Sequence, residues 1–144
     1  MDINLLKDYV IPYEAFTSLN LRRIKMNYFQ KANEYYNTKD YKKAIDLYEK
    51  AIQIKDNEAS SLYNSAVCFI KLKRYEKAIE LLNSAIKLRR ESKYFFNLGY
   101  CYIMLHNTKK ALIYFNNAWC LNNDDTDCEK AINTILKNYI TKTK

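Results

Sequence analysis

Glycine, proline and histidine are almost missing from this chain of 144 residues, which holds one of each: Gly99, Pro12 and His106. Average usage would give about 7% Gly and about 5% Pro. The tight turns of β-sandwiches and barrels depend on these two residues, and phosphate-binding loops need clustered glycines. A single histidine argues against a His-based metal site or a Ser-His-Asp triad. The sequence therefore predicts an all-α protein that is not an enzyme, with no catalytic residue, no cofactor and no metal.

The four cysteines also lack a metal-binding pattern. None of them forms a C-x-x-C pair, and no histidine stands at metal-ligand spacing from them. We expect reduced thiols and a cytoplasmic location. The N-terminus lacks the basic and then apolar pattern of a signal peptide. No run approaches the ~18 apolar residues of a membrane span.

The charge is moderately basic, with 24 Lys and Arg against 16 Asp and Glu, a net charge of +8. The basic residues are interspersed with acidic ones along the chain, and this pattern argues against a nucleic-acid partner. This balance indicates a soluble, Lys-rich surface that suits acidic peptide segments. Because the chain is also rich in aromatic residues, single-stranded RNA binding stays an alternative.

A repeat runs through the middle of the chain. Three alanines, Ala44, Ala78 and Ala111, stand 34 and 33 residues apart. Each is followed four positions later by a large residue and seven positions later by another alanine, spacings that lie on one face of a helix. Helices are therefore expected over 25–37, 41–54, 59–71, 75–88, 92–105 and 108–121.

The first helix of each unit has a small residue in the middle of its inner face. Its inner residues are Tyr28, Ala32 and Tyr35, then Leu62, Ala66 and Phe69, then Phe95, Gly99 and Tyr102. Two helices approach closely only where a side chain is nearly absent, so this pattern predicts tightly packed helical hairpins.

The third unit, with Phe95-x-x-Leu98-Gly99-x-x-Tyr102 and then Ala111-x-x-x-Phe115 and Ala118, resembles the tetratricopeptide repeat. The resemblance implies a right-handed α-α superhelix built from helix-turn-helix repeats. We expect a non-repeat extension over 1–24 and three repeats over 25–125, divided at about 25–58, 59–91 and 92–125. A capping helix and tail follow over 126–144. The apolar face of that helix comprises Ala131, Ile132, Ile135, Leu136, Tyr139 and Ile140.

The resemblance places the first helix of each repeat on the concave side of the superhelix. These helices carry a second stripe of mainly apolar residues, more than packing inside the chain requires. With Lys93, this stripe forms the predicted peptide groove: Phe29, Asn33, Tyr36, Tyr63, Val67, Ile70, Lys93, Phe96, Tyr100 and Ile103. Phe29, Tyr63, Phe96 and Tyr100 are the expected anchors, because aromatic rings offer large contact area with few rotors.

The predicted function is a protein-interaction module, an adapter or chaperone-like scaffold that binds a peptide or helix with acidic flanks. Some members of the family that this chain resembles bind a C-terminal carboxylate through five polar residues. Asn33, Asn64 and Lys93 match three of these positions, whereas Phe29 and Asn97 replace two cations. The loss of two cations weakens that interpretation. The basic cluster Lys87, Arg89, Arg90 and Lys93 is a candidate for meeting acidic ligand residues. Self-association through the apolar residues of segment 1–20 is the structural alternative.

Overall fold

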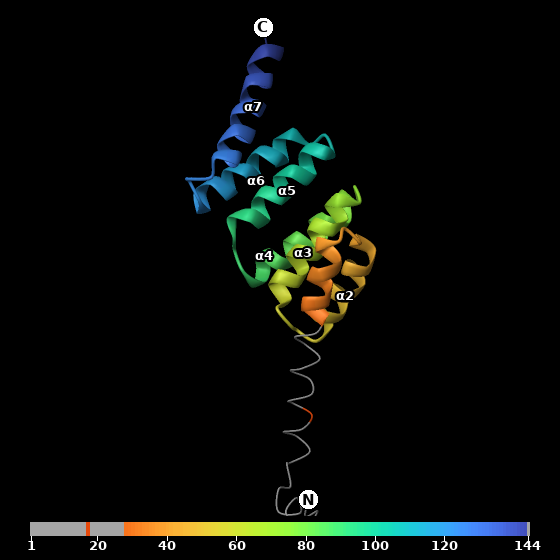
Figure 1. The fold of residues 1–144 in the computed structure, drawn as a ribbon. Helices are drawn as coiled ribbons and strands as arrows, with labels where there is room; N and C mark the ends of the chain where they lie inside the picture. The colour runs from red at the N-terminus through yellow and green to blue at the C-terminus, as the bar shows by residue number, and fades with distance from the viewer. Residues whose placement is uncertain (1–16, 18–27, 144) are drawn as a thin grey trace, which may run out of the picture.

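The computed structural model describes residue 17 and residues 28–143 of the chain. Residues 28–37 form a helix, and six further helices follow within the described range. They are α2 (Tyr41–Gln53), α3 (Glu58–Lys71), α4 (Tyr75–Leu88), α5 (Ser92–Met104), α6 (Thr108–Leu121) and α7 (Thr126–Lys142). Figure 1 shows these helices stacked along one direction, with α7 at the C-terminal end. The predicted extension over 1–24 and the self-association segment lie outside the described residues, residue 17 apart.

The predicted helices are confirmed to within one residue at each end that the structure describes. Polar side chains fix several of the starts. Asp40 accepts a hydrogen bond from the Lys43 backbone N–H at the start of α2 (3.3 Å), and Asn107 accepts one from Lys110 at the start of α6 (3.1 Å). These side chains satisfy backbone donors that lack a partner inside the helix.

Each helical hairpin turns through a residue with left-handed backbone geometry. Lys39, Lys73 and His106 have φ values of 63°, 59° and 59°. Glycine is the usual residue for this geometry because it has no Cβ to clash. The single glycine of the chain lies inside α5 instead, so side-chain-bearing residues take the strained positions.

The small residues of the repeat lie where the helices of a hairpin cross. Ala32 and Ala66 are fully buried, and Gly99 is buried at the equivalent place in α5. A Cβ on Gly99 would lie 2.7 Å from the Phe115 ring, which faces it from α6. The buried core formed around these crossings runs from the helix over residues 28–37 into α5 and continues into α7.

Two parts of the predicted core are wrong. Tyr35 is 36% exposed, with the Lys43 ammonium 5.3 Å above its ring. Phe69, at the same place in the next repeat, is buried because α2 of the preceding repeat packs against its helix. No repeat precedes the first one within the described residues, so Tyr35 lacks such a neighbour.

The second correction concerns the apolar face predicted for α7. Ile135 is buried against the core, whereas the next turns expose Leu136, Tyr139 and Ile140 to 44%, 56% and 59%. Figure 1 shows the reason: α7 leaves α6 steeply, and its second half projects beyond the stack. Only the first half of α7 therefore covers the last repeat.

Candidate functional site

The predicted groove residues lie at the boundary between the core and the solvent. Tyr100 is 39% exposed and Lys93 is exposed, while the other eight residues are all half-buried. The aromatic anchors pack against the core on one side. Phe29 lies against Tyr48, with ring centroids 6.1 Å apart, and Phe96 lies 5.3 Å from Phe115. The stripe thus serves internal packing and still offers surface, and no expected anchor is sealed inside.

Hydrogen bonds between neighbouring helices hold this surface together. Asn33 Oδ1 accepts from the Tyr48 hydroxyl (2.6 Å) and from Asn64 Nδ2 (3.2 Å). One repeat further, Asn97 Nδ2 donates to the Tyr63 hydroxyl (3.4 Å). Burial raises the pKa of Tyr48 to about 12 and also raises the pKa of Tyr63. Both phenols therefore stay neutral at ordinary pH, and the aromatic surface carries no negative charge of its own.

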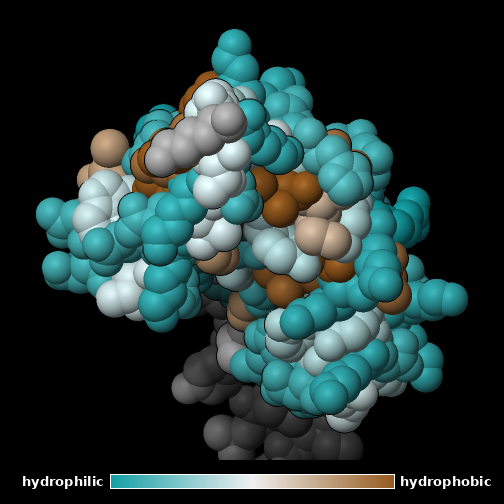
Figure 2. All heavy atoms as spheres, turned by 90° about the horizontal axis from the view of Figure 1, so that it is seen from above, coloured by the Kyte–Doolittle hydropathy of each residue, from teal (hydrophilic) through white to brown (hydrophobic). Residues whose placement is uncertain are grey.

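Four of the predicted residues line one pocket. It lies between α3 and α5, next to the start of α4, and has a volume of about 470 Å³. We call it the α3–α5 pocket; its lining residues are Val67, Ile70, Lys71, Lys73, Tyr75, Phe96, Asn97 and Tyr100. Figure 2, which views the molecule from above, shows apolar side chains reaching the surface between hydrophilic borders. The fold therefore brings side chains that stand about 30 residues apart into one apolar recess.

Lys71, Lys73 and Tyr75 were not among the predicted groove residues. A signal for Lys71 existed, because it stands four residues after Val67 on the same helical face. Lys73 and Tyr75 belong to the turn and to the start of α4, so their approach to the pocket depends on how the hairpin closes. Helical spacing within one segment gives no information on that closure.

Lys93 is already engaged by its own chain. Its ammonium lies 3.2 Å from Glu91 Oε2 and 4.9 Å from the centroid of the Tyr63 ring. Arg89 pairs with the other oxygen of Glu91 and donates to the hydroxyl of Tyr94 (3.0 Å). Two members of the predicted basic cluster thus share one carboxylate, which reduces the positive charge they present to a ligand.

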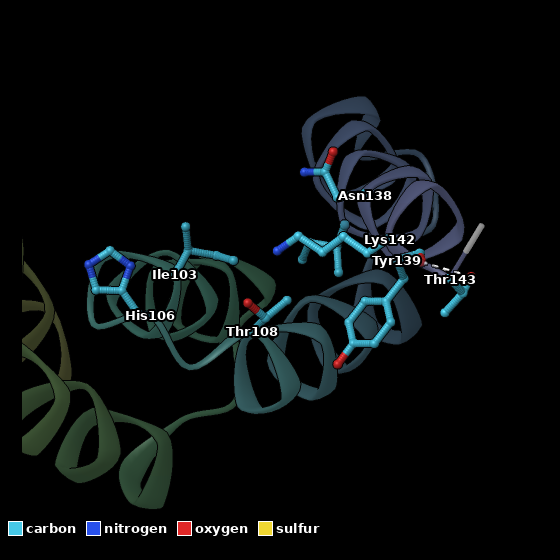
Figure 3. Close-up of a pocket in the computed structure, with 8 residues that line it drawn as sticks. Ile103, His106, Thr108, Asn138, Tyr139, Lys142 and Thr143 are labelled. Atoms are coloured by element: carbon cyan, nitrogen blue, oxygen red, sulfur yellow. Dashed lines mark hydrogen bonds between the residues drawn. The ribbon is translucent and has the colours of Figure 1, made fainter.

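Ile103 lies apart from the α3–α5 pocket. It lines a separate gap of about 630 Å³ between the turn after α5 and the end of α7. Figure 3 shows Lys142 extending from α7 toward Ile103, with Thr108 between the two elements. Phe29, Asn33 and Tyr36 belong to the first repeat and line neither pocket. The ten predicted residues therefore do not line one common pocket.

The described residues hold no group of three or more His, Cys, Asp or Glu side chains that could bind a metal ion. The cysteines in this part of the chain are free. Burial raises the pKa of Cys68 and of Cys101 to about 12, so both remain thiols and pack as small apolar groups. None of the helices in the described range combines the length and apolar character needed to cross a bilayer.

Comparison with known proteins finds similar sequences. The family model of anaphase-promoting complex (cyclosome) subunit 3 matches residues 22–85. The chain is 35% identical over 86 residues to the Hsp70-Hsp90 organising protein of Plasmodium falciparum, covering 60% of the chain. It is 34% identical over 94 residues to the heat shock protein STI1 of Saccharomyces cerevisiae, covering 59% of the chain. These matches span only 14% and 16% of the lengths of the two relatives.

Solved structures share the arrangement of the helices. The first TPR of Spaghetti (RPAP3), bound to an HSP90 peptide, matches with a TM-score of 0.76 at 20% identity, covering 82% of this chain and 94% of that one. The second TPR domain of human RPAP3, in complex with an HSP70 peptide, matches with a TM-score of 0.73 at 22% identity, covering 80% and 97%. With the repeat in the sequence and the helical hairpins of the structure, these matches identify the chain as a tetratricopeptide-repeat solenoid of three repeats followed by α7.

Proposed function

We propose that this chain is a non-catalytic protein-interaction module that binds a peptide or helical segment of a partner protein on the concave surface. The observation that carries the proposal is the α3–α5 pocket, in which Val67, Ile70, Phe96 and Tyr100 from two repeats line one apolar recess. Aromatic and aliphatic walls of this kind suit the apolar side chains of a peptide.

The comparisons support the same role. The two RPAP3 domains hold peptides of HSP90 and of HSP70, and the helical arrangement of this chain matches theirs. The name of one relative, the Hsp70-Hsp90 organising protein, refers to Hsp70 and Hsp90. We propose peptide binding by this chain on that basis, and a cytoplasmic location because free thiols suit a reducing compartment.

The test uses a random peptide display library selected against the purified chain. We expect selected peptides to carry apolar residues and to lose about tenfold in affinity for the Tyr100→Ser variant, because a half-exposed aromatic contact contributes about 1.4 kcal/mol or more to binding. Isothermal calorimetry measures the affinities, and circular dichroism verifies that the variant folds.

The matched control is Tyr139→Ser, which removes a tyrosine that is 56% exposed on α7, away from the pocket. Its affinity for the selected peptides should equal that of the wild type. Equal loss in both variants, or no loss in either, would contradict the proposed surface. Nuclear magnetic resonance titration should place the largest shifts at Val67, Phe96 and Tyr100. Shifts confined to the outward faces of α4 and α6 would exclude the groove.

A further inference from the structure

We propose that the α3–α5 pocket takes an apolar side chain from an internal segment of its partner, and that acidic residues beside that side chain pair with Lys71 and Lys73. This inference rests on the proposed function and specifies its ligand. It places the acidic contact at the end of the groove opposite Lys93.

The first observation is that Lys93, at one end of the groove, already has partners within its own chain. At the N-terminal ends of α3 and α5, Lys93 is paired with Glu91 at 3.2 Å and covers the rings of Tyr63 and Tyr94 at 4.9 and 5.7 Å. A ligand carboxylate there would have to displace or share Glu91, and its negative charge would approach that of Glu91. This end therefore gives a peptide C-terminus little electrostatic gain.

The second observation is the free charge at the other end. Lys71 and Lys73 line the pocket at the C-terminal end of α3, and both are exposed. Neither forms an ion pair within the part of the chain that the structure describes. Lys73 is the left-handed turn residue, so its backbone position is set by the hairpin. Two uncompensated ammonium groups thus border an apolar recess.

The third observation is the chemistry of the pocket walls. Val67 and Ile70 from α3 face Phe96 and Tyr100 from α5, and the space between them is about 470 Å³. This volume admits a Leu or Phe side chain with the backbone on either side of it. The lysines next to the recess then meet the residues that flank the buried one. A blocked internal segment with acidic flanks satisfies both features, whereas a C-terminal carboxylate bound at the Lys93 end would use neither lysine.

The experiment compares three synthetic peptides. The first is acetylated, amidated and has a Leu-Phe-Leu centre with three Glu on each side; the second has Gln in place of Glu; the third is the Gln peptide with a free C-terminal carboxylate. Two exposed charge pairs predict that the Glu peptide binds about fivefold tighter than the Gln peptide at low salt. The advantage should vanish at about 0.5 M salt. The free carboxylate should add no affinity.

Charge-matched variants test whether Lys71 and Lys73 cause the advantage of the Glu peptide. Lys71→Gln/Lys73→Gln should abolish the advantage of the Glu peptide, while Lys109→Gln/Lys137→Gln, which removes two exposed lysines elsewhere, should retain it. The inference fails if Glu and Gln peptides bind equally while both shift the Tyr100 resonance, and the proposed function then stands. It also fails if the free carboxylate raises affinity and Lys93→Gln removes that gain. If neither peptide shifts the pocket residues, the proposed function fails with it.

Discussion

At the scale of the residue, Gly99 shows how one contact selects one amino acid. The equivalent positions in the first two repeats hold Ala32 and Ala66, both fully buried. Tyr48 and Leu82 stand at the matching positions of the second helix in the first two repeats, and in the third repeat Phe115 faces the crossing point. Its ring occupies the space that a Cβ would need, so glycine is required there for reasons of volume rather than of backbone geometry.

We predict that Gly99→Ala lowers the free energy of unfolding by about 1 kcal/mol, the middle of the range left when the gain in helix propensity is subtracted from the cost of the clash. The clash with the enclosed Phe115 ring costs about 1–3 kcal/mol, which exceeds the helix propensity that alanine gains, about 1 kcal/mol. Urea denaturation measures the change. In a Phe115→Leu background the same substitution should be neutral or stabilising. The second repeat already combines these two residue types, with Leu82 at the position that matches Phe115 and Ala66 at the position that matches Gly99. A destabilisation of equal size in both backgrounds would rule out the ring as its cause.

At the scale of the element, the turn of each hairpin uses a residue with a side chain where left-handed backbone geometry favours glycine. Lys39, Lys73 and His106 adopt positive φ at the turn of every hairpin. Each of these turns also closes with a hydrogen bond from the following residue to a carbonyl five residues earlier, as Asp40 N–H does to Tyr35 (2.9 Å). The closure hydrogen bonds and the packing of the hairpins offset the cost of the backbone geometry.

Lys39→Gly should therefore raise the free energy of unfolding by about 0.5–1 kcal/mol. Glycine removes a left-handed penalty of about 1–2 kcal/mol and costs about 0.5–1 kcal/mol in chain entropy. The control is Lys137→Gly in the middle of α7, where the same replacement should destabilise by about 1 kcal/mol. Thermal unfolding followed by circular dichroism measures both. Two changes of the same sign would show that turn geometry is not the cause.

At the scale of the whole molecule, the core couples stability to alkaline pH. Cys68, Cys101 and Tyr48 are fully buried, and burial raises the pKa of each to about 12 from ordinary values of 9.0 and 10.0. In the unfolded chain these groups lose protons at their ordinary pKa values, while the folded chain keeps them protonated. The unfolded state then binds fewer protons, so stability falls as pH rises.

We expect a constant urea midpoint from about pH 7 to about pH 8 and a progressive decrease from about pH 9 toward pH 12. Measurements at about pH 7 and about pH 10 under reducing conditions test this. The Cys68→Ala/Cys101→Ala variant should show a smaller decrease, because two of the buried groups with a raised pKa are gone. A midpoint that does not move by pH 10, or an unchanged slope in the variant, would contradict the account.

The fold could be predicted because it depends on a pattern that repeats. The spacing of Ala44, Ala78 and Ala111, with the small residues at Ala32, Ala66 and Gly99, fixes which helical faces meet in each hairpin. That information is local, since a helix places residues three and four apart on one face. The helix bounds follow for the same reason, together with side-chain caps such as Asp40 and Asn107.

The site could be predicted only in part, since residues such as Tyr63 and Phe96 were assigned to the groove from their helical face alone. How the stripe divides depended on packing between repeats: Ile103 faces the gap beside α7, while Val67, Ile70, Phe96 and Tyr100 share one pocket. The pairing of Lys93 with Glu91, and the approach of Lys71 and Lys73 to the recess, also depended on how neighbouring elements sit.

The sequence by itself determined the helices, their pairing and the apolar stripes, because each follows from the period of a single helix. The tertiary structure decided which charges remain free, which stripe residues meet, and how much of α7 is covered. Those properties depend on the angles and distances between separate helices, and a periodicity within one segment gives no information about that geometry.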